Sequence, residues 1–296
     1  MVLNLQNLSM QNNIDEVNSK HGSFQFCVND QFIGTALKEY GEFSEIELSV
    51  MSKFIKKDDF VFDVGANIGA FTIPFAKKVM KTGKVFSFEP QPNVHNLLKS
   101  NVKLNNLDNV ELFQKGVGIR NEIIKIDEMD FSSSGNFGGF TLSLKYSNSD
   151  CGVIKKKKKN SVEILKIDDE FLHLKKCNFM KIDVELMEME VLKGAKKFIK
   201  KNKPFLWIEN NSNFPNQINK YLFEIGYNPY WSVTRVYNPS NYFINENNIY
   251  NKICTVNTLA IPEGIKINHE YYGLTKVIDP NTKPQSQVIE SLKYKL

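Results

Sequence analysis

A glycine-containing segment, Asp63-Val64-Gly65-Ala66-Asn67-Ile68-Gly69, has the residue types of a ligand-binding turn. It follows the apolar run 60–64, which predicts a buried strand, and it precedes a stretch with helical spacing. Glycine adopts backbone angles that other residues avoid, so the turn can run close to a ligand. In an open parallel sheet, such a turn lies at the carboxyl ends of the strands, where ligands bind. The residues expected to contact a cofactor here are Asp63, Gly65, Asn67 and Gly69.

A carboxylate follows at the end of the next predicted strand. Glu89 closes the run 84–89, twenty residues after Gly69, and a carboxylate at this place can accept hydrogen bonds from both hydroxyls of a ribose. A dinucleotide-binding loop has a central glycine that admits the pyrophosphate, but Asn67 occupies that position. S-adenosylmethionine has a ribose and no pyrophosphate, so the pattern favours this cofactor. An ordinary tight turn with a solvated glutamate is the alternative.

Two further acidic residues, Asp183 and Glu185, end the predicted strand 179–184 at the same edge of the sheet. Transfer of a methyl group from a sulfonium to a hydroxyl depends on alignment of the acceptor, and a nearby base assists it. We therefore take both residues as candidate catalytic groups, with Glu185 the preferred base. A helix-capping role for Glu185 and a loop-fixing role for Asp183 fit the sequence equally well.

The next predicted strand, 204–209, ends in Glu209, Asn210 and Asn211. Together with Asp183 these side chains would offer oxygen ligands for Mg²⁺. Buried anchoring of the loop is the preferred interpretation, so no metal site is predicted. Cys27, Cys151, Cys177 and Cys254 form no Cys-x-x-Cys pair and have no histidine at ligand spacing, so neither a zinc site nor a disulfide framework is indicated.

The combination of these motifs resembles the FkbM family of methyltransferases. The resemblance rests on residues 62–69, 88–90, 180–185, 191–195 and 257–262, with Tyr40-Gly41-Glu42 ahead of the first strand, and it covers residues 37–262. It implies a class I, Rossmann-like α/β fold: a doubly wound, mostly parallel seven-stranded sheet with one antiparallel strand. It also implies S-adenosylmethionine as cofactor and O-methylation of a small molecule or sugar. The family usually has glycine after Asp-Val-Glu, where this chain has Leu186, and we expect this difference to affect the acceptor more than the cofactor.

The surrounding pattern agrees with such a fold, because strands and helices alternate with short links. Predicted strands are 60–64, 84–89, 110–113, 179–184, 204–209, 227–232 and 255–261, and predicted helices are 70–79, 94–104, 189–199 and 218–225, with one or two more within 37–55. This alternation of strands and helices stops at about 116–165, where we expect a β-rich insertion with strands at 123–126 and 140–144. Lys155 to Lys159 predict an exposed loop or hairpin end there, since like charges repel.

The chain thus divides into an N-terminal extension (1–36), a methyltransferase domain (37–262) and a polar C-terminal tail (263–296). The formal charge of +5 comes from lysine, with Arg120 and Arg235 as the only arginines. Because guanidinium groups are favoured for reading phosphates and bases, nucleic acid is not the expected partner. An RNA methyltransferase and a non-catalytic protein of this fold remain alternatives.

The sequence also gives expectations for the location of the protein. Residues 1–6 lack the basic start and apolar run of a signal peptide, and no stretch approaches the roughly 20 apolar residues of a membrane helix. We therefore expect a cytoplasmic protein without a membrane span. The acceptor's identity and the oligomeric state do not follow from the sequence.

Overall fold

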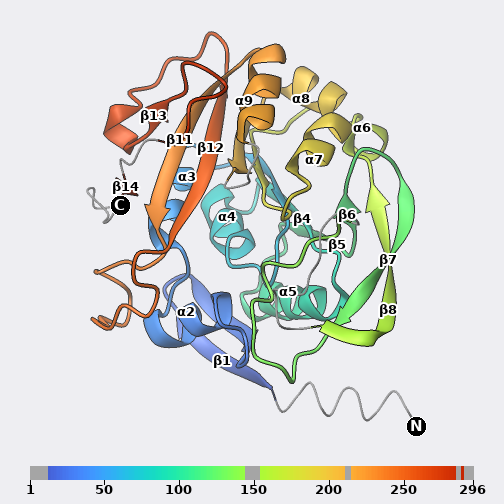
Figure 1. Cartoon of the computed structure of the whole chain (residues 1–296), viewed down its shortest axis with the longest axis vertical. Coiled ribbons are helices and arrows are strands. Elements are labelled where there is room, and N and C mark those ends of the chain that lie inside the picture. The colour runs from blue at the N-terminus through green and yellow to red at the C-terminus, as the bar shows by residue number, and fades with distance from the viewer. Residues whose placement is uncertain (1–12, 144–153, 211–214, 285–287, 290–296) are drawn as a thin grey trace.

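The computed structural model describes residues 13–143, 154–210, 215–284 and 288–289. At its centre, five parallel strands stand side by side (Figure 1). In spatial order they are β10 (Phe205–Glu209), β9 (Phe179–Ile182), β3 (Phe60–Val64), β4 (Lys84–Phe88) and β5 (Val110–Phe113). These strands read as nearly continuous apolar runs, as strands buried on both faces do. The predicted parallel core of the sheet is therefore confirmed.

Beyond β10 the sheet becomes mixed. Strand β12 (Cys254–Pro262) pairs antiparallel with both β10 and β11 (Tyr227–Arg235), so β11 again runs parallel to the central strands. Two short strands, β13 (Thr275–Lys276) and β14 (Val288–Ile289), also pair with β11. Within the described residues the sheet therefore has nine strands where seven were expected, because part of the segment 263–296 joins it.

Helices cover both faces of the sheet. The core that contains Phe62 and Val64 is completed by α7 (Glu188–Gly194), α8 (Lys196–Asn202) and α9 (Pro215–Glu224). The core that contains Val61 is completed by α3 (Glu45–Ser52) and α4 (Thr72–Val79). Since neighbouring residues of a strand point to opposite faces, Asp63 lies on the same face as Val61, beneath α4.

Several predicted helices differ in detail from the observed ones. The region 37–55 forms two helices, α2 (Ile33–Tyr40) and α3, separated where Gly41 and Ser44 adopt positive φ angles of 66° and 45°. The predicted helix 189–199 is interrupted at Ala195, between α7 and α8. Further helical elements are the long helix α5 (Pro92–Leu104), the short α6 (Ile167–Glu170) and the 3₁₀ turn η2 (Glu270–Tyr272).

The N-terminal region contains a hairpin that the sequence did not predict, β1 (Ile14–Ser19) and β2 (Gly22–Cys27). Strand β2 is attached to α5 by side-chain amides. The Asn101 Oδ1 accepts a hydrogen bond from the Gln25 N–H at 2.6 Å, and the Asn101 Nδ2 donates to the Gln25 carbonyl at 2.9 Å. The hairpin and α5 therefore share one core, which also contains Phe24, Phe26 and Leu97.

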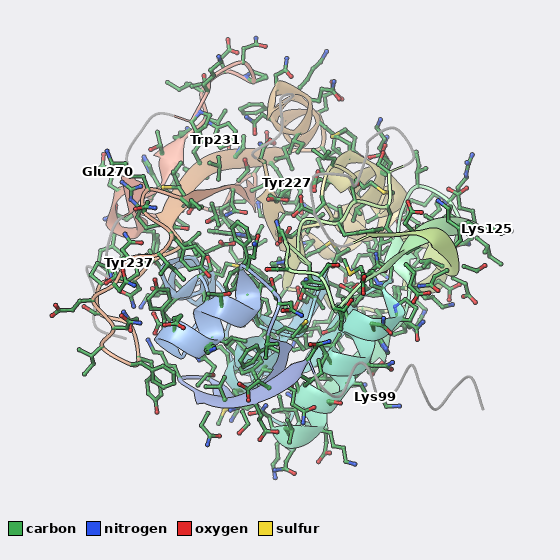
Figure 2. The ribbon with its side chains drawn as sticks, turned by 60° about the horizontal axis from the view of Figure 1, so that its bottom comes forward. Lys99, Lys125, Tyr227, Trp231, Tyr237 and Glu270 are labelled. Atoms are coloured by element: carbon green, nitrogen blue, oxygen red, sulfur yellow. The ribbon has the colours of Figure 1, made fainter. Side chains whose placement is uncertain are left out.

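The insertion forms a separate sheet of β6 (Gly116–Val117), β8 (Ile154–Leu165) and β7 (Glu122–Met129). One prediction is wrong here, because no strand forms among the described residues of 140–144. Lys155 to Lys159 do not form a loop; they lie in β8, at the end of its antiparallel pairing with β7. Pairing with β7 offsets the repulsion between lysines, because Lys159 Nζ lies 2.6 Å from Asp127 Oδ1. Lys125 on β7 lies at the periphery of the molecule (Figure 2).

The described residues contain no helix with the length and apolar character needed to cross a bilayer.

Candidate functional site

A cavity of about 350 Å³ opens at the carboxyl ends of the central strands. Five of the seven residues predicted as site residues line it: Gly65, Asn67, Glu89, Asp183 and Glu185. The remaining two, Asp63 and Gly69, do not line it. Further walls come from segments far apart in the sequence, represented by Phe32 and Ile33 near α2, Phe137, Phe140 and Leu142 in the insertion, and Val236 and Ile253 between β11 and β12.

The turn after β3 depends on its glycines. Gly65 has a φ of +86°, and a Cβ at this position would lie 1.7 Å from the carbonyl oxygen of Asp183. No side chain fits there without displacing the backbone of the neighbouring strand end. Gly69 has a φ of +94°, and its Cβ would meet Leu98 Cδ1 at 2.8 Å. Gly69 therefore allows the turn to pack on α5, while Gly65 allows the turn to approach the main chain of Asp183.

Glu89 is held in a fixed orientation at the end of β4. Its Oε2 accepts the Asn67 N–H at 3.0 Å, and its Oε1 accepts the Gln91 N–H at 2.8 Å. Asn67 reaches this position with a φ of 49°, which asparagine tolerates better than most residues. The carboxyl group is only 6% exposed, and burial raises its pKa to about 7. Its oxygens keep lone pairs for the hydroxyls of a ligand.

Asp63 and Lys181 form a buried charged group under the turn. Asp63 is fully buried and its Oδ2 accepts a hydrogen bond from Thr72 Oγ1 at 2.6 Å. Lys181 Nζ lies 3.8 Å from Asp63 Oδ1, donates to Asp183 Oδ2 at 2.9 Å, and stands 4.9 Å from the centre of the Phe71 ring. Burial alone would lower the pKa of Lys181, but Asp183 and Asp63 outweigh this effect and raise the pKa above its ordinary value.

Sequence reasoning assigned no role to Lys181, although a signal was present. A lysine in the middle of the apolar strand Phe179–Ile182 must be buried, and a buried lysine needs an acidic partner. Asp63 and Asp183 were the nearest acidic residues at strand ends. Burial raises the pKa of Asp63, and the positive charge of Lys181 opposes this rise beneath the turn after β3.

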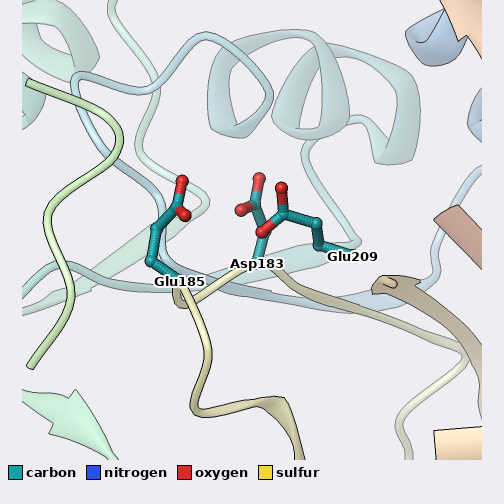
Figure 3. Close-up of side chains that lie close together, drawn as sticks. All are labelled: Asp183, Glu185 and Glu209. Carbon is teal, nitrogen blue, oxygen red and sulfur yellow. The ribbon is translucent and has the colours of Figure 1, made fainter. Parts of the chain in front are cut away.

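Three carboxyl groups that belong to residues lining the cavity lie close together (Figure 3). One oxygen each of Asp183, Glu185 and Glu209 lies within 4.8 Å of the other two. Burial, and then the neighbouring Asp183, raise the pKa of Glu185 to about 8. The same causes raise the pKa of Glu209 well above its ordinary range. The structure thus brings the two candidate catalytic residues together, and it adds Glu209 to them.

Glu209 was interpreted from the sequence as a loop anchor, but its carboxyl group lines the cavity. Its neighbour Asn210 points away from the cluster, since its Nδ2 donates to Thr258 Oγ1 at 2.9 Å. Asn211 lies outside the described residues. Among the described residues, the carboxyl oxygens that could together hold a divalent cation belong to Asp183, Glu185 and Glu209. The set considered from the sequence did not include Glu185.

The turn that delivers Glu185 to the cluster is strained. Glu185 and Leu186 have φ angles of 50° and 73°, a conformation that costs roughly 1–2 kcal/mol for each residue other than glycine. Glu188 holds the turn, because its Oε1 accepts the N–H groups of Val184 at 3.3 Å and Leu186 at 3.2 Å. The positive φ at position 186 is a conformation that glycine adopts without this cost. Met187 lines the cavity, whereas Leu186 is 37% exposed and does not.

A residue of α3 also reaches the cavity. Glu47 accepts hydrogen bonds from Trp207 Nε1 at 3.0 Å and from Ser44 Oγ at 3.0 Å, and burial raises its pKa. Trp207 is fully buried, as predicted for a core residue. The sequence signal for Glu47 was an acidic residue within an apolar helical pattern, which by itself gives no partner.

Comparison with known proteins identifies a family. Residues 63–229 match the model of the methyltransferase FkbM domain. "Methyltransferase 1" of Beauveria bassiana (strain ARSEF 2860) is 28% identical over 146 residues, which are 46% of this chain and 58% of that protein. The chain therefore matches only a little over half of the length of this relative.

Two solved structures with a similar fold are a methyltransferase and a complex with AdoMet. Methyltransferase FkbM from Methylobacillus flagellatus KT has a TM-score of 0.43 and 18% identity, over 69% of this chain and 44% of that chain. M. jannaschii TYW2 in complex with AdoMet has a TM-score of 0.46 and 15% identity, over 84% of this chain and 85% of that chain.

Proposed function

Since the chain belongs to the FkbM methyltransferase family, we propose that it uses S-adenosylmethionine and methylates a hydroxyl group of a small molecule or sugar. The observation that supports this proposal is that one cavity, at the carboxyl ends of the strands, is lined by both kinds of group. Glu89 can accept hydrogen bonds from ribose hydroxyls, and Asp183, Glu185 and Glu209 form a carboxyl cluster.

The turn at Gly65 and the carboxyl group of Glu89 would bind the cofactor. Glu89 presents fixed oxygens for ribose hydroxyls, and Gly65 and Asn67 line the cavity beside it. The bound cofactor supplies an activated methyl group. Asp63 would contribute indirectly, by holding Thr72 and Lys181 beneath the turn, and Gly69 by letting the turn pack against Leu98.

Glu185 is the proposed general base. A base works best when its pKa is close to the operating pH, and that of Glu185 is raised to about 8. Asp183, bonded to Lys181, would orient the acceptor hydroxyl beside it. Glu185 would take the proton of the acceptor hydroxyl, so that its oxygen could accept the methyl group while S-adenosylhomocysteine is released as the other product.

The chemistry of the cavity wall favours a neutral acceptor. Glu47, Asp183, Glu185 and Glu209 line the cavity, and their carboxyl oxygens can accept hydrogen bonds from hydroxyl groups. The two lysines among the described lining residues are already paired, Lys181 with Asp183 and Asp63 and Lys115 with Glu163, so a phosphate group would find no unpaired lysine there. This wall therefore supports a sugar or other small hydroxyl compound over RNA.

The test is a turnover assay that follows S-adenosylhomocysteine release with neutral sugars, small alcohols and folded RNA as acceptors. The proposal predicts release with a neutral hydroxyl compound, a product heavier by one methyl group, and loss of turnover in Glu185→Gln. Turnover with RNA but with none of the neutral compounds, or RNA binding that weakens steeply with salt, would contradict the proposed acceptor class.

We further propose that the segments outside the central sheet determine the acceptor. The insertion places Phe137, Phe140 and Leu142 on the cavity wall, and the N-terminal region places Phe32 and Ile33 there. Loops carried by a rigid scaffold commonly provide specificity. Hydrogen exchange at residues 135–140 should slow when cofactor and acceptor bind, and unchanged exchange would contradict this role.

A further inference from the structure

Gln91 has a buried side chain whose amide group has no explained role in the fold. It follows Glu89 and Pro90 and lines the cavity. Its side chain is 4% exposed, and within the described part of the chain its Nε2 has no hydrogen-bond partner. Buried amide donors are nearly always bonded. A donor that is buried, unbonded and on a cavity wall indicates a partner supplied by the ligand.

The local structure shows that Gln91 is not simply a helix cap. It is the N-cap residue of α5, with extended backbone angles, yet its side chain makes no capping hydrogen bond. Asparagine, aspartate, serine and threonine are the side chains that cap well at this position. The backbone of Gln91 has a separate task, since its N–H donates to Glu89 Oε1 at 2.8 Å. The main chain of Gln91 is thereby fixed next to the carboxyl group proposed to hold the ribose.

An apolar wall adjoins this donor. A Cβ at Gly116 would lie 2.7 Å from Leu142 Cδ1 and 3.8 Å from Pro90 Cβ, so these three residues are close neighbours, and all three line the cavity. An apolar wall near a buried donor and a carboxyl group suited to ribose hydroxyls fits a nucleoside, which offers an aromatic ring and several acceptor atoms.

We propose that Gln91 recognises the nucleoside part of the cofactor, with its Nε2 donating a hydrogen bond to an acceptor atom of adenosine. This inference rests on the proposed use of S-adenosylmethionine. Gln91 and Glu89 then act as a complementary pair, because the amide donates to the nucleoside while the carboxyl group accepts from it.

Calorimetric titration of the full chain with two ligands tests the proposal. S-adenosylhomocysteine contains both the nucleoside and the amino-acid part, whereas 5′-methylthioadenosine contains only the nucleoside with a methylthio group. The variant Gln91→Leu removes the donor at similar size, and Gln91→Glu replaces it with an acceptor. The matched control is Gln114→Leu, because Gln114 is exposed and outside the cavity.

We expect Gln91→Leu to weaken both ligands by a similar factor of about 3 to 10, Gln91→Glu to weaken them at least as much, and Gln114→Leu to leave both unchanged. The melting temperature of unliganded Gln91→Leu should equal or exceed that of the parent, since no bond of the folded protein is lost. Undiminished binding by either Gln91 variant, weakening of S-adenosylhomocysteine alone, or a fall in the unliganded melting temperature that accompanies the loss of affinity would overturn the proposal. Absence of binding by the parent protein would instead refute the proposed cofactor.

Discussion

The carbonyl oxygen of Asp183 occupies the space that a side chain at Gly65 would need, at 1.7 Å from an ideal Cβ. The turn after β3 and the end of β9 therefore meet backbone to backbone. This contact places the proposed cofactor turn next to the candidate catalytic residues, and it makes Gly65 the most constrained position of the site.

Gly65→Ala should abolish binding of S-adenosylhomocysteine and lower stability. The methyl group would collide with main chain, which cannot move aside cheaply, and alanine resists a φ of +86°. Gly138→Ala is the matched control, because Gly138 also lines the cavity but its Cβ would have no neighbour closer than 3.4 Å. Calorimetry and thermal melting measure both. Equal behaviour of the two variants would contradict the role given to Gly65.

Leu186→Gly should keep or raise the melting temperature, although glycine usually destabilises folded proteins. The φ of 73° at Leu186 costs roughly 1–2 kcal/mol, and relief of this strain exceeds the roughly 0.5–1 kcal/mol of chain entropy that glycine adds. Leu104→Gly is the control, since Leu104 is equally exposed at 37% but helical, and its melting temperature should fall. A similar fall in both variants would show that the turn is not strained.

Lys181→Met should destabilise the fold by roughly 3–5 kcal/mol, because it leaves a buried carboxylate uncompensated. Lys181 is buried between Asp63 and Asp183. Denaturant unfolding of Lys181→Met, Asp63→Asn and the double variant forms a mutant cycle. The double variant should be clearly more stable than the sum of the single losses predicts. Additive losses would mean that Lys181 and Asp63 do not interact.

The parts of the fold that were predicted share one property: their signal lies within a short stretch of sequence. The strand Phe60–Val64 and its neighbours are continuous apolar runs, and Gly226 ends α9 with a φ of 78° as expected for a stop signal. Strand β8 escaped prediction because local repulsion among the lysines gave no information about the acidic strand beside it, where Asp127 pairs with Lys159.

The residues of the site also divide into those that a short stretch of sequence could predict and those that it could not. Glu89 and Asp183 could be found because they end predicted strands, and parallel strands end at one edge of the sheet. Glu47 and Gln91 could not, because their importance depends on contacts across the fold: Glu47 with Trp207, and Gln91 with a cavity wall that includes the insertion. Sequence alone also could not show that Leu186 adopts the backbone angles of the glycine it replaces.

The turnover rate should rise with pH through about 8 if Glu185 is the base. Its pKa is raised to about 8, so the carboxyl group is protonated and inactive well below that pH and becomes able to accept a proton above it. The apparent value belongs to the cluster with Asp183 and Glu209, because the groups titrate together. Glu185→Gln should remove this rise and lower the rate roughly a hundred- to ten-thousand-fold. A pH profile that persists in Glu185→Gln would assign the base elsewhere.

The central claim, that this cavity binds S-adenosylmethionine through the turn at Gly65 and the carboxyl group of Glu89, is tested most directly by calorimetric titration with S-adenosylhomocysteine. The control variant is Glu111→Ala, since Glu111 is exposed and outside the cavity. We predict one bound ligand per chain in the parent and in Glu111→Ala, and at least about tenfold weaker binding in Glu89→Ala, where a charged hydrogen-bond acceptor is lost. No binding by the parent, or undiminished binding by Glu89→Ala, would contradict the account.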